Sequence, residues 1–252
     1  KDIAWTHRRS FKNDSYFIAN QQAMSRTLSY SFRCIAAQAM LYNPVTDELS
    51  ELKAKQEYDR TLVTLSLAAN ESAFILLFDQ KQALPLSQQP KPLKQDSLAG
   101  AWKVRFDSQK GGSQQVQTFE QLSDWATHPD SLIRYYSGTA IYSKNFVQQT
   151  ISTSKRYWLD LGKVANIASV RLNGVDCGVA WTAPYRVEIT QALRTGENKL
   201  EVSVSNTWVN RLIGDRRLPE KQQISYTTAP YRLEGRALES SGLLGGVSLW
   251  EE

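Results

Sequence analysis

The stretch ASVRLNGVDCGVAW, residues 168–181, decides the fold. It places Asn173-Gly174 between two runs in which apolar and polar residues alternate. Both central residues of a type I′ turn need a positive φ angle, and this dipeptide between alternating runs is the strongest short-range signal for a β-hairpin. The stretch therefore predicts two antiparallel strands joined by a two-residue turn.

The same alternation continues on both sides of this hairpin. Further strands are predicted in SGTAIYSKNFV, RYWLDLGKV, NKLEVSVSN and SGLLGGVSLW, at residues 137–147, 156–164, 198–206 and 241–250. In the third of these, Leu200, Val202 and Val204 are expected to face inward. A short helix or turn capped at Ser123 interrupts the series. Strands at nearly regular spacing without a long helical period predict an all-β sandwich of the jelly-roll type over residues 99–252.

The first part of the chain predicts a separate small antiparallel β-domain over residues 16–80. Leu28, Tyr30, Phe32 and Cys34 alternate with polar residues, as they do in a half-buried strand. Residues 81–98 differ in character, because they combine three prolines with many glutamines and lysines and show no periodicity. We interpret them as a linker between the two domains.

Composition describes an ordinary globular protein. Hydrophobic residues make up 41% of the 252 positions and charged residues 22%, with a formal net charge of +5. The dense basic cluster is THRRSFK at residues 6–12, and no basic stripe interleaved with aromatics is visible, so nucleic acid is not an expected partner. No transmembrane run and no signal peptide are visible, so no membrane partner is expected either.

The two cysteines do not suggest chemistry. Cys34 and Cys177 lie far apart without metal-ligand spacing, and a disulfide between them would have to cross the predicted domain boundary. Cys34 falls on the apolar side of an alternating run, which is typical of a small buried hydrophobic residue. We therefore expect two free thiols.

Catalytic motifs are weak in this sequence. His7 and His128 are not paired at metal-ligand spacing, and neither a nucleophile elbow nor a phosphate-binding glycine loop is present. A glycosidase needs two carboxylates facing each other across a sugar, and the spacing of the carboxylates in this chain opposes no two of them. The sequence assigns no catalytic residue and no metal site to the chain.

The segment SNTWVNRLIGD, residues 205–215, has two open interpretations. In the structural one, Trp208 and Leu212 pack inward, Asn210 bonds turn backbone, and Arg211 pairs with Asp215. In the functional one, Trp208 stacks on a sugar while Asn210 and Arg211 bind its hydroxyls. The structural interpretation is favoured, because polar clusters in loops usually satisfy one another.

Several of these segments carry a family resemblance. The stretch from WLDLG to NRLIGD, the strand SGTAIYSKNF and the terminal SGLLGGVSL resemble the C-terminal sandwich of glycoside hydrolase family 106, the α-L-rhamnosidases. That module is similar to the galactose-binding-like, sugar-binding jelly roll of family 2 hydrolases. The stretch IAWTHRRSFKNDSYFIANQ resembles the point where the same family leaves its catalytic (α/β)8 barrel, so residues 1–15 are interpreted as a remnant of that exit segment.

The resemblance implies that the catalytic acid and base, with a calcium ion near the sugar, belong to a barrel outside this chain. No cofactor is assigned to the chain itself, and the barrel becomes its expected partner. His7 and Arg8 are the residues that the resemblance places near the active site of the parent enzyme. It also implies a periplasmic or extracellular location.

Three hypotheses for the function follow. The first is a non-catalytic C-terminal β-sandwich part of an α-L-rhamnosidase-like enzyme, which supports the barrel and contacts carbohydrate. The second is a free carbohydrate-binding module with Trp181, Tyr185 or Trp208 as stacking platforms. The third is a structural domain that docks onto another protein through an apolar patch.

Overall fold

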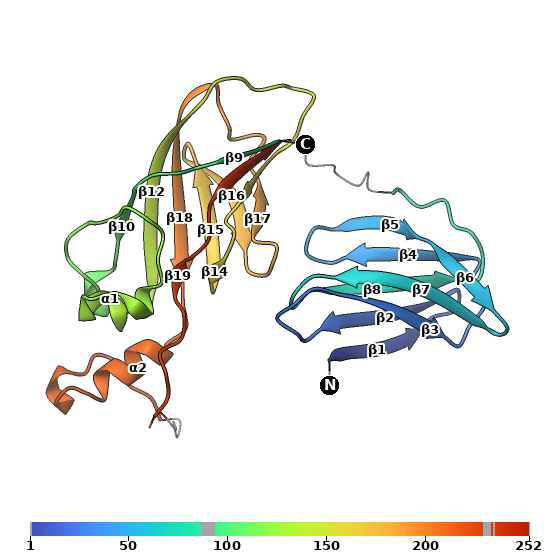
Figure 1. Ribbon diagram of the computed structural model, residues 1–252, viewed down its shortest axis with the longest axis horizontal. Helices are drawn as coiled ribbons and strands as arrows, with labels where there is room; N and C mark the ends of the chain where they lie inside the picture. The colour runs from blue at the N-terminus through green and yellow to red at the C-terminus, as the bar shows by residue number, and fades with distance from the viewer. Residues whose placement is uncertain (1, 87–93, 229–232, 234, 252) are drawn as a thin grey trace. The chain divides into compact units, whose positions relative to one another are not determined.

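The computed structural model describes residues 2–86, 94–228, 233 and 235–251. The chain divides into two compact units, Lys1–Pro90 and Lys91–Glu252, and both are built almost entirely from antiparallel strands (Figure 1). The predicted all-β class is confirmed. Within the described ranges, the search for a helix of sufficient length and hydropathy to cross a bilayer finds no candidate.

The first unit consists of two antiparallel sheets. The five-stranded sheet has the order β1-β2-β8-β4-β5 and the three-stranded sheet the order β3-β7-β6. Their strands are β1 (Ile3–Arg9), β2 (Asn13–Asn20), β3 (Arg26–Phe32), β4 (Gln38–Asn43), β5 (Glu48–Leu52), β6 (Ala54–Glu57), β7 (Arg60–Leu67) and β8 (Ser72–Phe78).

The core of this unit lies between its two sheets. Ile18 and Ile75 from the larger sheet are buried in one cluster with Val63 and Leu65 from the smaller sheet. Along β7 and β8 the buried residues alternate, as the period of two requires. The two strands belong to different sheets, so the short connection between them carries the chain from one layer to the other.

The N-terminal segment belongs to this first unit. Strand β1 pairs with β2 over its whole length, from Ile3 opposite Asn20 to Arg9 opposite Asp14. The sequence prediction places residues 1–15 outside the β-domain, whereas in the structure β1 is the edge strand of its larger sheet. The interpretation of the segment as a barrel exit stays a prediction. The predicted linker, residues 81–98, lies partly outside the described residues, at 87–93, and ends in a strand that pairs within the second unit.

The second unit is a β-sandwich. One sheet has the order β11-β10-β12-β18-β15-β16, the other has the order β17-β13-β20-β9, and β14 pairs with β19. The strands are β9 (Lys94–Ser97), β10 (Trp102–Arg105), β11 (Gln117–Phe119), β12 (Thr139–Gln148), β13 (Tyr157–Asp160), β14 (Val164–Ala165), β15 (Ile167–Leu172), β16 (Val175–Ala180), β17 (Arg186–Glu188), β18 (Gly196–Ser205), β19 (Gly242–Leu243) and β20 (Ser248–Glu251).

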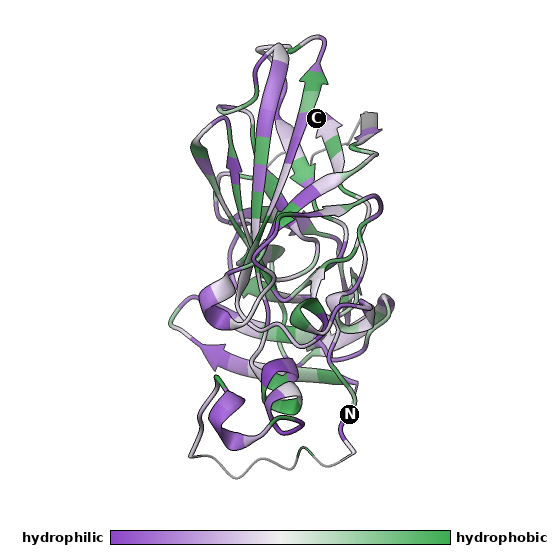
Figure 2. Cartoon of the chain, turned by 90° about the vertical axis from the view of Figure 1, so that its left-hand side faces the viewer, coloured by the Kyte–Doolittle hydropathy of each residue, from purple (hydrophilic) through white to green (hydrophobic). Residues whose placement is uncertain are grey.

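Alternating side chains build the core of this sandwich. Leu200, Val202 and Val204 of β18 are fully buried, as predicted, and pack in one cluster with Leu159 of β13 and Leu249 of β20. Because successive side chains of a strand point to opposite faces, only every second residue reaches this core. Figure 2 shows the alternation as green and purple bands along the long strands.

The hairpin that decides the fold is confirmed. Leu172 pairs with Val175, and the turn residues Asn173 and Gly174 have φ angles of 53° and 83°. The side chain of Asn173 also donates a hydrogen bond of 2.9 Å to the carbonyl oxygen of Ala192. The turn is therefore fixed by backbone conformation and by a tie to a neighbouring loop.

Short helices lie in the loops of the sandwich. The predicted cap at Ser123 is wrong by one residue, because the Asp124 carboxylate accepts the hydrogen bond of the Ala126 backbone N–H at 2.9 Å. This cap opens a single 3-10 turn, Trp125–Thr127, which is followed by α1 (Ser131–Arg134). After β18 the chain forms α2 (Val209–Asp215) and another 3-10 turn, Glu220–Gln222, and a further 3-10 turn, Ser108–Lys110, follows β10.

Candidate functional site

Helix α2 carries the polar segment that the sequence singled out, and it forms directly after β18. Six of its seven residues, from Asn210 to Asp215, are buried, and they include the charged Arg211 and Asp215. Leu212 and Ile213 pack in a small apolar cluster with Leu233. A helix this short is stabilised mainly by its tertiary contacts, because so few intrahelical bonds do not offset the cost of nucleation.

Asn210 holds this helix to a loop that lies far along the chain. Its amide nitrogen donates to the carbonyl oxygen of Glu239 at 2.7 Å, and its amide oxygen accepts from the backbone N–H of the same residue at 2.8 Å. Asn206 makes a similar tie, accepting from the Gly138 N–H at 2.9 Å and donating to the Tyr136 carbonyl oxygen at 2.9 Å. Both amides therefore replace backbone partners that the loops lack.

Arg211 and Asp215 form a buried ion pair. Arg211 Nη2 lies 2.8 Å from Asp215 Oδ1, and the two side chains are 8% and 4% exposed. The other carboxylate oxygen, Oδ2, accepts hydrogen bonds from the backbone N–H groups of Ser225 at 2.8 Å and Ile224 at 3.2 Å. Asp215 thus ties the segment after α2 back onto the helix.

Two glycines make room for the guanidinium. A Cβ atom at Gly111 would lie 3.2 Å from Arg211 Nη1, and one at Gly214 would lie 3.0 Å from Arg211 Nη2. The side chain is therefore enclosed by the protein, and Arg211 Nε has no hydrogen-bond partner among the described residues. For Asn210, Arg211 and Asp215 this geometry favours the structural interpretation over contact with a ligand.

The aromatic candidates behave differently from one another. Trp208 is 55% exposed, so the expectation that it packs inward is wrong, although Leu212 is buried as expected. Trp181 is 60% exposed at the end of β16. Tyr185 is half-buried and packs against the sandwich core. Of the three predicted stacking platforms, the two tryptophans therefore present free ring surface and the tyrosine presents little.

His7 and Arg8 lie on opposite faces of the five-stranded sheet, because successive residues of a strand point in opposite directions. The His7 ring stacks on Tyr16, with ring centroids 4.3 Å apart and planes 7° apart. Its Nε2 atom lies 2.6 Å from Oδ1 of Asp14, which is buried. The structure therefore does not bring the two predicted residues together, and His7 is engaged by its own sheet.

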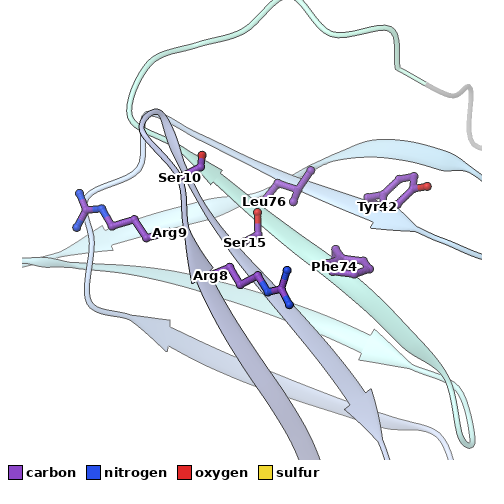
Figure 3. A pocket seen from close by; sticks show the side chains of 7 residues that line it. All are labelled: Arg8, Arg9, Ser10, Ser15, Tyr42, Phe74 and Leu76. Atoms are coloured by element: carbon purple, nitrogen blue, oxygen red, sulfur yellow. The ribbon is translucent and has the colours of Figure 1, made fainter.

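Arg8 lines a shallow hollow on the outer face of that sheet. The hollow has a volume of about 480 Å³, and Figure 3 shows the side chains around it: Arg8, Arg9, Ser10, Ser15, Tyr42, Phe74 and Leu76. The hydroxyl of Tyr42 donates to Asp47 Oδ1 at 3.0 Å, and this hydrogen bond raises the pKa of the Tyr42 phenol. The sequence carries no local signal for this hollow, because its residues come from four separate strands and one turn.

Two further hollows lie in the second unit. One, of about 490 Å³, lies between β9 and β12 and includes Asp96 and Lys144. The other, of about 630 Å³, lies beside α2 and includes Arg216, Arg217 and Arg236. Across the three hollows, the described lining residues include a single carboxylate, that of Asp96, whereas glycoside hydrolysis by paired carboxylates needs two.

Metal binding finds no support in the described part of the chain. No group of three or more histidine, cysteine, aspartate or glutamate side chains lies close enough there to hold an ion. The family resemblance places its calcium ion in the barrel, so this finding does not bear on that expectation.

Comparison with known proteins identifies a domain and a related structure. Residues 120–241 match the family described as glycosyl hydrolase 2 galactose-binding domain-like. A putative β-glucuronidase of Formosa agariphila is 45% identical over 132 residues, which cover 52% of this chain and 11% of that protein. The rhamnosidase of Novosphingobium sp. PP1Y is similar over 99% of this chain and 24% of its own, with 36% identity and a TM-score of 0.77.

These comparisons confirm the coarser part of the sequence interpretation. The sandwich contains a galactose-binding-like domain related to glycoside hydrolases. The chain spans about a quarter of the rhamnosidase and about a ninth of the putative β-glucuronidase that it matches. A match over so small a part of each protein does not show that this chain shares the activity of either whole protein.

Proposed function

We propose that the chain is the non-catalytic C-terminal β-part of an α-L-rhamnosidase-like glycoside hydrolase of family 106. Its partner is a catalytic (α/β)8 barrel, which supplies the acid, the base and the calcium ion. The two β-units support that barrel and contact carbohydrate. An enzyme of this kind meets its glycans after export, so the proposal places the parent protein in the periplasm or outside the cell.

One observation carries this proposal. The likeness to the rhamnosidase covers 99% of the chain, which includes both units, yet only 24% of the rhamnosidase. The match to the galactose-binding-like family lies within the second unit, and the match to the putative β-glucuronidase covers about half of the chain, so neither covers both units in full. Because the likeness runs through both units, it favours a rhamnosidase-like order of modules along the chain over the sharing of one sandwich domain alone.

The residues of the chain fit a supporting role. Asn206, Asn210, Arg211 and Asp215 direct their polar atoms to one another or to the backbone of the loops around α2. Contacts of this kind hold a surface in one conformation, which a domain docked onto an enzyme needs. The catalytic carboxylates are assigned to the barrel, because glycosidic bond cleavage requires two facing carboxyl groups.

The coding sequence immediately upstream of Lys1 tests this proposal. We expect it to encode, in the same reading frame, an (α/β)8 barrel with acidic residues at the C-terminal ends of its strands, where the active sites of such barrels lie. An upstream region without a barrel in frame would contradict the proposal.

A second candidate is a free-standing carbohydrate-binding module, and the exposure of Trp181 and Trp208 favours it. Exposed indole rings offer flat apolar faces on which sugars can stack. Titration with neutral oligosaccharides, followed by tryptophan fluorescence, tests it with the variants Trp181→Ala and Trp208→Ala. A change in fluorescence that either variant abolishes would support this candidate, and no change at millimolar sugar would contradict it.

A further inference from the structure

The strand register of the first unit gathers a basic group and an apolar floor on one face of the sheet. Arg8 on β1 lies opposite Ser15 on β2, and Ser15 lies opposite Leu76 on β8. In the neighbouring row, Phe74 on β8 lies opposite Tyr42 on β4. Cross-strand neighbours on one face of a sheet lie side by side, so these five residues form one continuous surface.

The hollow in this surface arises from a difference in side-chain size. Ser15 is small and stands between Arg8 and Leu76, whereas the rings of the next row are large. The Phe74 ring lies 5.1 Å from Phe17 and 6.0 Å from Tyr42, measured between ring centroids. This aromatic group borders the depression left by Ser15, and Phe74 and Leu76 give it an apolar floor.

The guanidinium of Arg8 is available at this hollow. Its side chain extends along the face toward Phe74, whereas Arg9 points away at the rim (Figure 3). Other arginines of the chain, such as Arg211 and Arg186, are engaged by carboxylates within 4 Å. Arg8 has no ion pair and no side-chain hydrogen bond with the described residues, although its planar fork of donors suits a carboxylate.

The polar groups at the rim also retain hydrogen-bonding capacity. Ser15 Oγ accepts from Asn13 Nδ2 at 3.4 Å, which leaves its O–H free to donate. The hydroxyl of Tyr42 is committed to Asp47, so Tyr42 offers its ring and not its oxygen. The hollow therefore combines one cationic fork, one hydroxyl donor and an apolar floor.

We propose that this hollow binds a uronic acid residue of a glycan. The carboxylate pairs with the Arg8 guanidinium, the C–H face of the sugar ring lies on Phe74 and Leu76, and a ring hydroxyl accepts from Ser15. In a uronate the carboxylate is attached directly to a rigid ring. One sugar residue can therefore pair with the Arg8 guanidinium and lie on the apolar floor at the same time. An aspartate or glutamate side chain would bring the carboxylate without the flat ring.

This binding site goes beyond the proposed function. A domain that supports a barrel does not need to recognise an acidic sugar, and the hollow lies wholly in the first unit. The upstream coding sequence decides the accessory role, whereas binding by the isolated chain decides the uronate site. Failure of one therefore leaves the other standing.

Calorimetric titration of the full chain with trigalacturonic acid at low salt tests the site. We expect saturable binding that weakens on addition of 0.5 M salt, because the Debye length falls to about 4 Å at that concentration. Arg8→Gln should weaken binding by about tenfold or more, because a hydrogen-bonded charge partner is lost. Arg33→Gln is the matched control, since Arg33 is also an exposed arginine of this unit and does not line the hollow.

Two comparison ligands decide the chemistry. The fully methyl-esterified trigalacturonate has the same rings without the charge, and equal affinity for it would overturn the role of the carboxylate. A hexapeptide of glutamates has the charge without the rings, and equal affinity for it would overturn recognition of a sugar. Absence of binding, or binding that Arg8→Gln leaves unchanged, would overturn the site itself.

Discussion

Arg211 Nη2 lies 2.8 Å from Asp215 Oδ1, one helical turn apart on α2, and both side chains are more than nine-tenths buried. The second oxygen of Asp215 accepts backbone hydrogen bonds from Ile224 and Ser225, which follow the helix. A carboxylate placed in this way neutralises a buried cation and anchors a loop. The pair therefore explains why a polar segment stands in the interior of this part of the sandwich.

Replacing Asp215 with alanine is expected to destabilise the chain strongly. The change leaves the Arg211 guanidinium buried without its counter-charge and frees two backbone N–H groups. Loss of one partner of a buried ion pair costs about 3–5 kcal/mol. Urea unfolding followed by fluorescence measures the change in the free energy of unfolding.

Glu201→Ala provides the control for that measurement. Lys199 Nζ lies 3.1 Å from Glu201 Oε1, but the lysine side chain is 64% exposed. Exposed pairs contribute about 0–1 kcal/mol, so this variant should change the unfolding free energy little. Similar losses of unfolding free energy in Asp215→Ala and Glu201→Ala would contradict the structural role of the Arg211–Asp215 pair.

Gly174 in the hairpin turn is a position where an added methyl group changes stability through backbone conformation and not through a steric clash. Gly174 has a φ of 83°, and a Cβ atom there would meet nothing within 4 Å. Gly174→Ala should therefore lower the free energy of unfolding by about 1–2 kcal/mol, which is the cost of the left-handed conformation. Gly246 also has open space around it but no positive φ, so Gly246→Ala should change stability by less than about 1 kcal/mol in either direction. Equal effects of the two changes in thermal unfolding would contradict the prediction.

The buried phenol of Tyr142 is expected to make the chain less stable in alkaline solution. The residue is fully buried, and burial raises the pKa of its phenol well above the ordinary value of 10.0. Above pH 10 the unfolded chain loses this proton while the folded chain keeps it, so the free energy of unfolding falls as pH rises. The slope that this group contributes approaches about 1.4 kcal/mol per pH unit.

Tyr142→Phe tests that slope. The variant loses the hydroxyl that accepts from Trp125 Nε1 at 2.6 Å and from the Leu243 N–H at 3.2 Å, so it should be less stable at pH 8 by about 1–3 kcal/mol. Its stability should then fall less steeply between pH 9 and pH 11 than that of the parent chain. Parallel pH profiles would contradict the assignment. Tyr58→Phe, a fully exposed site, controls for the substitution.

The thiols of the two cysteines are expected to react slowly with disulfide reagents in the folded chain. Cys34 and Cys177 are free and half-buried, and burial raises the pKa of both thiols. The thiolate is the reactive form, so its fraction at pH 8 is smaller than in the unfolded chain. Reaction with a chromogenic disulfide should be about tenfold or more slower in buffer than in urea, and two thiols per chain should react in urea without reductant. Fast reaction in buffer, or fewer than two thiols in urea, would contradict this.

Local patterns predicted the elements of the fold because strand and turn signals are local. The Asn173-Gly174 turn needs positive φ at two adjacent positions, and the inward series of Leu200, Val202 and Val204 needs only the period of two. Local patterns did not predict which strands belong to the same sheet. Strands β7 and β8 are neighbours in sequence but lie in different layers, and no local signal distinguishes such a crossover from a hairpin.

The site was predicted in part, for a similar reason. The Arg211–Asp215 pair was expected because the fork of a guanidinium suits a nearby carboxylate, and the structure contains it, although the segment is a helix where a loop was expected. The partners of Asn210 and Asp215 in the loops at Glu239 and Ser225 are set by tertiary packing, and the sequence carries no signal for them. Trp208 was expected inside because tryptophans usually pack in cores, but it stands at the N-cap of α2 and is 55% exposed.

The central claim is that the groups that cleave a glycosidic bond do not belong to this chain. Initial-rate assay of the purified chain with an aryl α-L-rhamnoside, compared with buffer and with heat-treated chain, tests it most directly. The account predicts no release of the aryl group above the rate in buffer. Sustained turnover that heat treatment abolishes would contradict it.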